Sequence, residues 1–166
     1  DQVALYEILL EAAAALGGGP VGGRALGALR IEKGYGSWGR EYSPEYWPQE
    51  AGLHGLIKLD KDFLNKEAYL KISNTPPRES LTMFEVDVTD NADANGGEPI
   101  FLADGTPVGR VTSGSYGYTV GKSLAIGYAR EGVVRAGDSV EIFILGKPHA
   151  ATVLDKPPFD AGGERL

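Results

Sequence analysis

Apolar residues recur at two different periods along the chain, and the change of period divides it into two parts. Up to about residue 73 they mostly follow a three- to four-residue spacing typical of helices. Beyond Arg78 they alternate with polar residues, as in strands that bury one face. The intervening run Ser73–Arg78 is rich in polar residues and proline. We therefore predict a boundary there, with one domain over residues 1–74 and a second over residues 78–166.

The first part is predicted to be mainly helical. Leu5, Leu9 and Leu16 form one apolar stripe, and the helix that carries them ends at Gly17–Pro20 because proline cannot continue its hydrogen bonds. A later helix has Asp62 available as its N-cap. The expected elements are helices over residues 3–16 and 23–33, a short strand over 53–59 and a helix over 62–71. An irregular stretch over residues 35–48, crowded with Tyr and Trp, lies between them.

The second part is predicted to be a small antiparallel β-barrel. Phe84, Val86 and Val88 face one way while the residues between them face the other, and Asp104–Thr106 is a strong hairpin signal. The strands are expected over residues 81–88, 99–103, 107–112, 124–129, 139–145 and 150–154. Five to seven short strands with turns between them indicate a closed or nearly closed barrel. The predicted fold class is therefore α+β.

Composition removes several classes of function. The net charge of −7 and the absence of a basic cluster argue against nucleic-acid binding, which needs a positive face. No apolar stretch approaches the roughly 20 residues of a membrane-spanning helix, so we expect no membrane partner. With no Cys and only His54 and His149, no metal site is expected. The lack of Cys is compatible with a reducing cytoplasm, and a cytoplasmic location is the expectation.

Motifs that would reveal a familiar catalytic centre are missing. Neither a dinucleotide-binding G-x-G-x-x-G after a strand nor a phosphate-binding G-x-x-x-x-G-K-[ST] loop is present. His54 and His149 each suit a structural role better than a catalytic one. Arg30 and Glu32 lie two positions apart on a helix, so they do not face each other, and each is expected to hold the helix against a different neighbour.

A family resemblance supplies what motifs alone do not. The run R-A-L-G-A-L-R-I-E-K-G-Y-G-S-W-G, residues 24–39, resembles a signature in the folate-binding part of dimethylglycine and sarcosine dehydrogenases. Four later runs are similar to stretches of the aminomethyltransferase family, which includes the glycine cleavage T-protein: P-Q-E-A-G-L (48–53), K-L-D-K-D-F (58–63), G-T-P-V-G-R-V-T-S-G (105–114) and P-F-D (158–160). These matches occur in order along the whole chain.

The resemblance implies the C-terminal remnant of a folate-binding aminomethyltransferase fold, followed by its barrel domain. In this family a methylene group passes from an amine to tetrahydrofolate in a central channel, steadied by a carboxylate in the N-terminal half of the module. No part of this chain matches that half, so we assign no catalytic residue here and expect the isolated chain to be inactive. The FAD of the dehydrogenases would likewise bind outside these residues. The expected partners are folate, an amine substrate and a missing N-terminal part of the same chain. The sequence also allows an oligomer.

Three residues become candidates for folate binding through this resemblance. Tyr35 matches a tyrosine that lines the family's folate pocket, and Trp38 is a weaker aromatic candidate; both also suit a structural role. The T-protein's arginine for the folate carboxylate corresponds to Leu26 here, so Arg24 is the alternative cation, with a surface salt bridge as its competing role. Leu26 favours the dehydrogenase branch.

Other functions stay open at this point. The chain could belong to a stand-alone aminomethyltransferase such as the T-protein, or to a sulfoniopropionate demethylase of the same fold. It could also serve as a non-catalytic module that forms one wall of the folate channel. A flavin domain upstream would distinguish the dehydrogenase from a stand-alone transferase.

Overall fold

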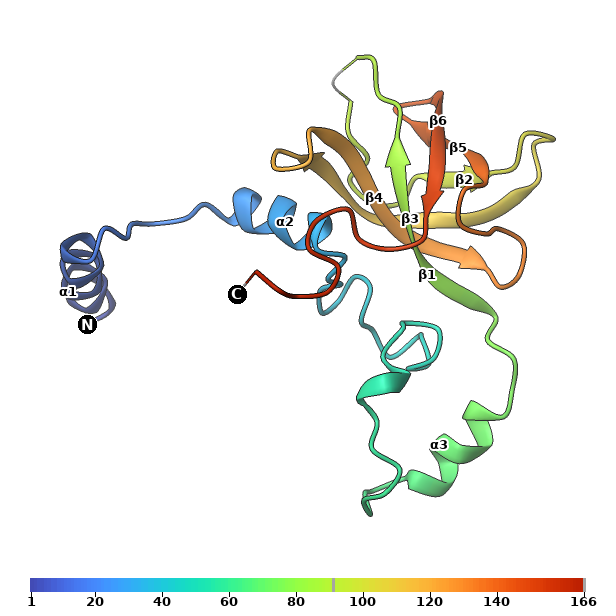
Figure 1. Cartoon of the computed structure of the whole chain (residues 1–166), viewed down its shortest axis with the longest axis horizontal. Coiled ribbons are helices and arrows are strands. Elements are labelled where there is room, and N and C mark those ends of the chain that lie inside the picture. Colours follow the sequence, from blue (N-terminus) through green and yellow to red (C-terminus); the bar gives the residue numbers. More distant parts are fainter. Residues whose placement is uncertain (91, 166) are drawn as a thin grey trace.

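Six strands close into an antiparallel barrel in the computed structural model, which describes residues 1–90 and 92–165 (Figure 1). The strands are β1 (Glu79–Val86), β2 (Pro99–Phe101), β3 (Pro107–Gly117), β4 (Lys122–Arg130), β5 (Ser139–Ile144) and β6 (Lys147–Leu154). Their order around the barrel is β1, β4, β3, β2, β5 and β6, and β6 pairs again with β1. The α+β class and the closed barrel predicted from the alternating pattern are therefore confirmed.

Apolar side chains from every strand fill the barrel. In β5 and β6 buried and more exposed positions alternate, as expected for strands with one face inside. The predicted Asp104–Thr106 hairpin joins β2 to β3, with Gly105 at φ +82°. The interior cluster contains Phe84, Val86, Ala94, Ile100, Val108, Val111, Ala125, Ala129, Val140, Ile142, Ile144, Ala151 and Val153.

Strand β4 is buried on both faces, which a strand in a lone barrel would not be. Its residues Ser123–Ala129 are all buried. Ala125 and Ala129 belong to the barrel interior, whereas Leu124 and Ile126 pack outside it against Ile31. This second apolar cluster attaches the helical part of the chain to the barrel wall.

The helices differ sharply in how they contact the barrel. They are α1 (Gln2–Ala15), α2 (Gly23–Glu32) and α3 (Lys66–Ser73), with a short 3-10 turn, η1 (His54–Leu56). Helix α2 lies against β3 and β4, whereas α1 projects away and buries none of its residues (Figure 1). Nor does α3 bury any side chain. Across the described residues, no helix has the length and apolarity needed to cross a bilayer.

In the first part, one predicted element is wrong and the predicted start of another is wrong. The strand expected over residues 53–59 is instead the 3-10 turn His54–Leu56, followed by two residues without regular structure and a turn that begins at Leu59. Gly52 at φ +71° turns the backbone there, and none of the strands in the described part of the chain pairs with this segment. The helix expected over residues 62–71 begins only at Lys66, after Asn65 in a left-handed conformation, so Asp62 is not its N-cap.

Candidate functional site

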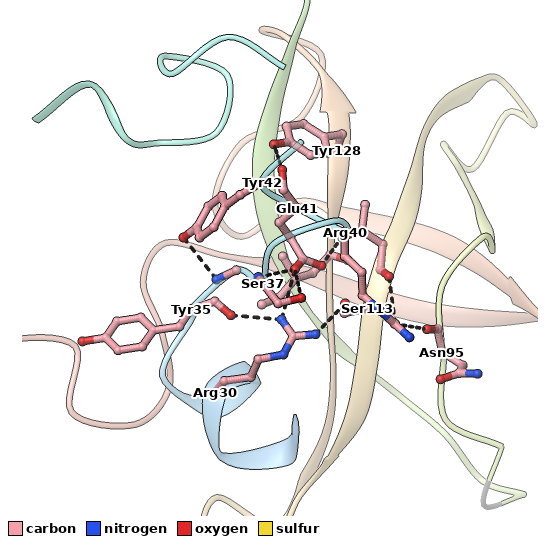
Figure 2. A network of polar contacts seen from close by, with 12 residues as sticks. Arg30, Tyr35, Ser37, Arg40, Glu41, Tyr42, Asn95, Ser113 and Tyr128 are labelled. Carbon is pink, nitrogen blue, oxygen red and sulfur yellow. Dashed lines mark hydrogen bonds and ion pairs between the residues drawn. The ribbon is translucent and has the colours of Figure 1, made fainter. Parts of the chain in front are cut away.

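A fully buried carboxylate, that of Glu41, is the centre of a polar network between α2, the loop that follows it and β3 (Figure 2). Its Oε2 accepts hydrogen bonds from the Ser37 amide at 2.8 Å and from Arg30 Nη1 at 3.1 Å. Its Oε1 accepts a third from Thr112 Oγ1 at 2.6 Å. Burial alone would raise the pKa of Glu41, but these hydrogen bonds and the Arg30 charge lower it below its usual value. The carboxylate is therefore held ionised as a structural anchor.

Arg30, near the end of α2, ties three segments together. Its Nη1 also donates to the Tyr35 carbonyl at 3.0 Å, and its Nη2 donates to Ser113 Oγ at 2.7 Å. Glu32 points elsewhere, accepting hydrogen bonds from the Thr119 and Val120 amides at the β3–β4 turn. The expectation that Arg30 and Glu32 hold the helix against different neighbours is confirmed.

A β-bulge places Thr112 where it can reach Glu41. Val111 pairs with Gly127 and Ser113 with Ile126, so Thr112 is an extra residue in β3 with no opposite partner in β4. A bulge bends a strand and turns a side chain out of the regular ladder. Here it directs the Thr112 hydroxyl outward, toward the loop that carries Glu41.

The network fixes the backbone of the Tyr35 loop and leaves its aromatic rings uncovered. The Tyr35 carbonyl is bound by Arg30, but the residue is 59% exposed and its ring points away from the network (Figure 2). Trp38 is 83% exposed. Neither ring stacks on another aromatic ring within the described residues. Two aromatic faces are thus presented to solvent by a rigid loop.

Arg24 does not share a cleft with these two rings. It lines a cleft of about 630 Å³ between α2, residues 37–40, residues 93–95 and β3, together with Arg30 and Arg40. Tyr35 and Trp38 are absent from the walls of that cleft. Figure 2 shows Arg40 and Asn95 on the opposite side of the network from the Tyr35 ring. The structure therefore places Arg24 in a cleft to which neither Tyr35 nor Trp38 contributes.

Besides Glu41 and Thr112, sequence reasoning missed two polar features around this region. Arg40 was not singled out, although a cation within the aromatic-rich stretch over residues 35–48 was visible in the sequence. The second feature is Glu50, fully buried and held by two hydrogen bonds from the Arg78 guanidinium, at 2.8 and 2.7 Å. Because Arg78 precedes β1, this pair fixes the connection between the helical part and the barrel.

No metal chemistry is suggested by the residues that the structure describes. Among residues 1–90 and 92–165, no three His, Cys, Asp or Glu side chains are grouped to hold a metal ion. A cleft of about 850 Å³ lies at one end of the barrel, where Asp93, Tyr116 and Tyr118 form part of its wall. It is separate from Tyr35, Trp38 and Arg24.

Comparison with known proteins gives the same family for both parts of the chain. Residues 80–160 match the glycine cleavage T-protein C-terminal barrel domain, and residues 1–61 match the GCVT N-terminal domain. Mouse dimethylglycine dehydrogenase is 39% identical over 159 residues, which are 95% of this chain and 18% of that protein. Thus the chain spans less than a fifth of the length of this relative.

Other relatives are enzymes with different names. The 4-methylaminobutanoate oxidase (formaldehyde-forming) of Paenarthrobacter nicotinovorans is 36% identical, covering 99% of this chain and 20% of that protein. An aminomethyltransferase of Thermotoga neapolitana is 32% identical, covering 92% of this chain and 41% of that protein.

A solved structure shares the fold. The glycine cleavage system aminomethyltransferase T from Bartonella henselae superposes with a TM-score of 0.73 at 24% identity, over 82% of this chain and 38% of that one. The barrel, the helices that precede it and two consecutive family matches agree. The chain belongs to the glycine cleavage T-protein family.

Proposed function

We propose that this chain is the folate-binding one-carbon transfer portion of a flavin-dependent dimethylglycine or sarcosine dehydrogenase. In that role it helps to pass a methylene group from a demethylated amine to tetrahydrofolate. The observation that carries the proposal is the rigid loop that presents the open faces of Tyr35 and Trp38, in a chain 39% identical to a dimethylglycine dehydrogenase. Tetrahydrofolate would supply the nitrogen that accepts the carbon, and FAD bound outside these residues would oxidise the amine.

The residues present fit a flat heteroaromatic ligand. A pterin or aminobenzoyl ring stacks on an aromatic side chain when that side chain has a free face and a fixed position. Tyr35 has a free ring face, and the bond from Arg30 to its carbonyl holds the backbone from which the ring projects. Trp38 has the more exposed ring, and its backbone pairs with that of Tyr42 in an isolated bridge. We propose that Tyr35 is the principal ring contact and Trp38 a secondary one.

Arg24 is the cation that we propose for the carboxylate end of folate. Its side chain forms no ion pair with a carboxylate of the described residues. Leu26 is exposed nearby on the same helix and cannot bind an anion. An arginine suits this task because its planar guanidinium can make two parallel hydrogen bonds to a carboxylate.

The catalytic carboxylate is proposed to come from polypeptide outside these 166 residues. Two observations support an additional segment packed on the helical part. The chain covers only 18% of its dehydrogenase relative. Helices α1 and α3 bury no side chain, although α1 exposes Val3, Leu5, Ile8 and Leu9. We propose that residues 1–74 complete a folate channel with that segment, while residues 78–166 form the barrel domain.

Calorimetric titration of tetrahydrofolate into the flavoprotein that contains this chain tests the proposal. We expect Tyr35→Ala to raise the dissociation constant by about tenfold, as expected for loss of a stacked ring. Amine oxidation measured with an artificial electron acceptor should stay close to its original rate. Tyr118→Ala, which removes an 82% exposed tyrosine from the β3–β4 turn, is the matched control.

Unchanged folate affinity in both Tyr35→Ala and Trp38→Ala would contradict the binding role. The alternative of a stand-alone aminomethyltransferase is favoured by one observation, the match to 41% of such an enzyme. A parent protein that transfers the aminomethyl carbon without a bound flavin would establish that alternative. The cytoplasmic location expected from composition stays a prediction.

A further inference from the structure

Residues 95 and 96 form the one Asn-Gly pair in the sequence. In such a pair the backbone nitrogen of the glycine can attack the side-chain amide of the asparagine, because glycine has no side chain to hinder the approach. Ammonia leaves and a five-membered succinimide ring remains. Water then opens the ring to aspartate or to isoaspartate, in which the main chain runs through the former side chain. The pair can therefore be modified without an enzyme.

The fold requires the glycine of this pair. Gly96 has φ +128°, a conformation that residues with a side chain rarely adopt. A Cβ at this position would also lie 2.6 Å from the carbonyl oxygen of Thr112, which is a backbone atom of β3. The reactive nitrogen thus belongs to a position where the fold allows no other residue.

The asparagine of the pair has an unrestrained side chain. Asn95 is exposed, and no hydrogen bond within the described part of the chain holds its side-chain amide. Its hydrogen bonds are made by the backbone, whose carbonyl accepts from Arg40 Nη1 at 3.0 Å and whose amide donates to Glu98 Oε1 at 2.9 Å. The side-chain amide points away from Arg40 (Figure 2). Nothing in this arrangement prevents it from rotating toward the Gly96 nitrogen.

The carboxylate of Glu98 restrains the attacking nitrogen. Its Oε2 accepts a hydrogen bond from the Gly96 amide at 2.8 Å. Ring formation needs this amide to lose its proton and to turn toward the Asn95 side chain. A carboxylate is too weak a base to remove the proton of a peptide amide, so the charge-assisted hydrogen bond holds the proton in place. Glu98 is fixed in turn, because its carbonyl accepts from the Val111 amide at 2.8 Å.

The position of Arg40 gives the isoaspartate product a consequence. In isoaspartate the carbonyl group of residue 95 becomes a free carboxylate, and that carbonyl is the acceptor of the Arg40 hydrogen bond. No carboxylate of the described chain lies within ion-pair distance of Arg40, which lines the cleft of about 630 Å³ beside α2. The product would therefore pair with Arg40 and neutralise its charge in the cleft.

We propose that Asn95–Gly96 is a site of spontaneous deamidation, delayed by Glu98 and directed by Arg40 toward isoaspartate. In the first step a bond forms between Gly96 N and Asn95 Cγ while the Cγ–Nδ2 bond breaks, and the proton of the Gly96 amide passes through water to the departing ammonia. In the second step one water molecule breaks the ring bond between the carbonyl carbon of residue 95 and the nitrogen of residue 96. Arg40 polarises that carbonyl and so favours attack there. The inference stands independently of the proposed function.

Peptide mapping by mass spectrometry tests the site in the full-length protein that contains this chain, incubated at mildly alkaline pH. The exchange of an amide for an acid changes the mass, and chromatography separates aspartate from isoaspartate. We expect Asn95 to convert on the order of tenfold more slowly than in a free peptide of residues 93–98, as for one charge-assisted hydrogen bond. Glu98→Ala should bring the rate close to that of the peptide. Glu11→Ala, which removes an exposed carboxylate from α1, should have no effect.

Two further variants separate the roles of Glu98 and Arg40 from a general loosening of the fold. Glu98→Gln keeps the size of the side chain and one acceptor oxygen, so its rate should lie between those of the original protein and Glu98→Ala. Hydrogen exchange of the Gly96 amide should quicken in the same order. Arg40→Gln should lower the isoaspartate fraction to that of the free peptide.

Three results would overturn the proposal or one of its parts. An Asn95 that stays unconverted in Glu98→Ala, over a time in which the free peptide converts, would remove the site. A rate that is unchanged or lower in both Glu98 variants would remove the protective role, and a lower rate would make the carboxylate a base. An isoaspartate fraction that is the same with and without Arg40 would remove the directing role.

Discussion

The rings of Tyr46 and Tyr128 lie parallel, with centroids 3.5 Å apart and an angle of 3° between their planes. Tyr128 belongs to β4 and is fully buried, and its hydroxyl donates to the Glu41 carbonyl at 2.8 Å. Tyr46 lies in the loop that crosses the barrel wall, where its hydroxyl accepts a hydrogen bond from Arg110. Burial raises the pKa of both phenols, so both remain neutral in the physiological range.

This stack predicts a difference between two substitutions of Tyr46. Tyr46→Ala should lower the free energy of unfolding by about 2 kcal/mol, because it removes buried ring area and the stacking contact. Tyr46→Phe keeps the ring and loses only the bond from Arg110, so it should cost less than about 1 kcal/mol. Urea unfolding followed by fluorescence measures both. Equal losses would mean that the stack contributes little.

Substitutions of Arg30 and Glu41 should have strongly coupled effects on the free energy of unfolding. Arg30→Met would leave the Glu41 carboxylate buried without its cation, and we expect the free energy of unfolding to fall by about 3 kcal/mol. Adding Glu41→Gln removes the uncompensated charge and should restore part of that loss. Chemical denaturation of the two single variants and the double variant measures the coupling. Strictly additive effects would be inconsistent with this network.

Glu50 predicts a specific acid sensitivity. The hydrogen bonds and charge of Arg78 lower the pKa of Glu50 from 4.5 to about 2. A carboxyl with a lowered pKa in the folded state stabilises the fold fully above its unfolded pKa, and this contribution is lost as the pH falls toward the folded pKa. Stability should therefore decline between pH 4.5 and about 2.

Glu50→Gln is the variant that isolates this contribution. It should be less stable than the original chain at pH 7, and the difference should shrink as the pH approaches 2. Glu79→Gln, a neighbouring carboxyl outside the Arg78 pair, serves as the control. A gap between Glu50→Gln and the original chain that does not change with pH would argue against the ion pair.

Deletion of helix α1 should not change the stability of the rest of the chain. Since α1 buries no residue, removing residues 1–16 should leave the unfolding free energy of the barrel within about 0.5 kcal/mol of its original value. Removing residues 1–33 also deletes α2 and with it Ile31 and Arg30, and should destabilise the barrel strongly. Denaturation curves of the two truncated chains provide the comparison.

The barrel and α2 could be predicted from sequence because each has a repeating pattern with an identifiable end. The alternation around Phe84 and Val86 and the glycine after α2 are local signals. The prediction of a strand over residues 53–59 was wrong because a short apolar run is compatible with several structures. Such a run forms a strand only when a neighbouring strand pairs with it. The start of α3 failed because Asn65, in a left-handed turn, preceded the helix where Asp62 was expected to cap it.

The candidate site could be predicted only in part from the sequence, because tertiary contacts determine much of it. Tyr35, Trp38 and Arg24 came from a family pattern, which records residue types but not the surfaces on which they lie. The contact between Glu41 and Thr112 depends on a bulge, and the Arg40 cleft depends on how residues 93–95 cross β3. Such contacts arise from tertiary folding, and no local pattern reports them.

The bulge at Thr112 has an evolutionary consequence. Glu41 and Thr112 are 71 positions apart, yet the hydroxyl reaches the carboxylate only because β3 contains one extra residue. A homologue without the bulge in β3 would leave the buried carboxylate of Glu41 with one hydrogen-bond donor fewer. Such a homologue should therefore also have another residue in place of Glu41. Residues 41 and 112 should accordingly covary. In an alignment of homologous sequences, the two changes should occur on the same branches of the phylogenetic tree.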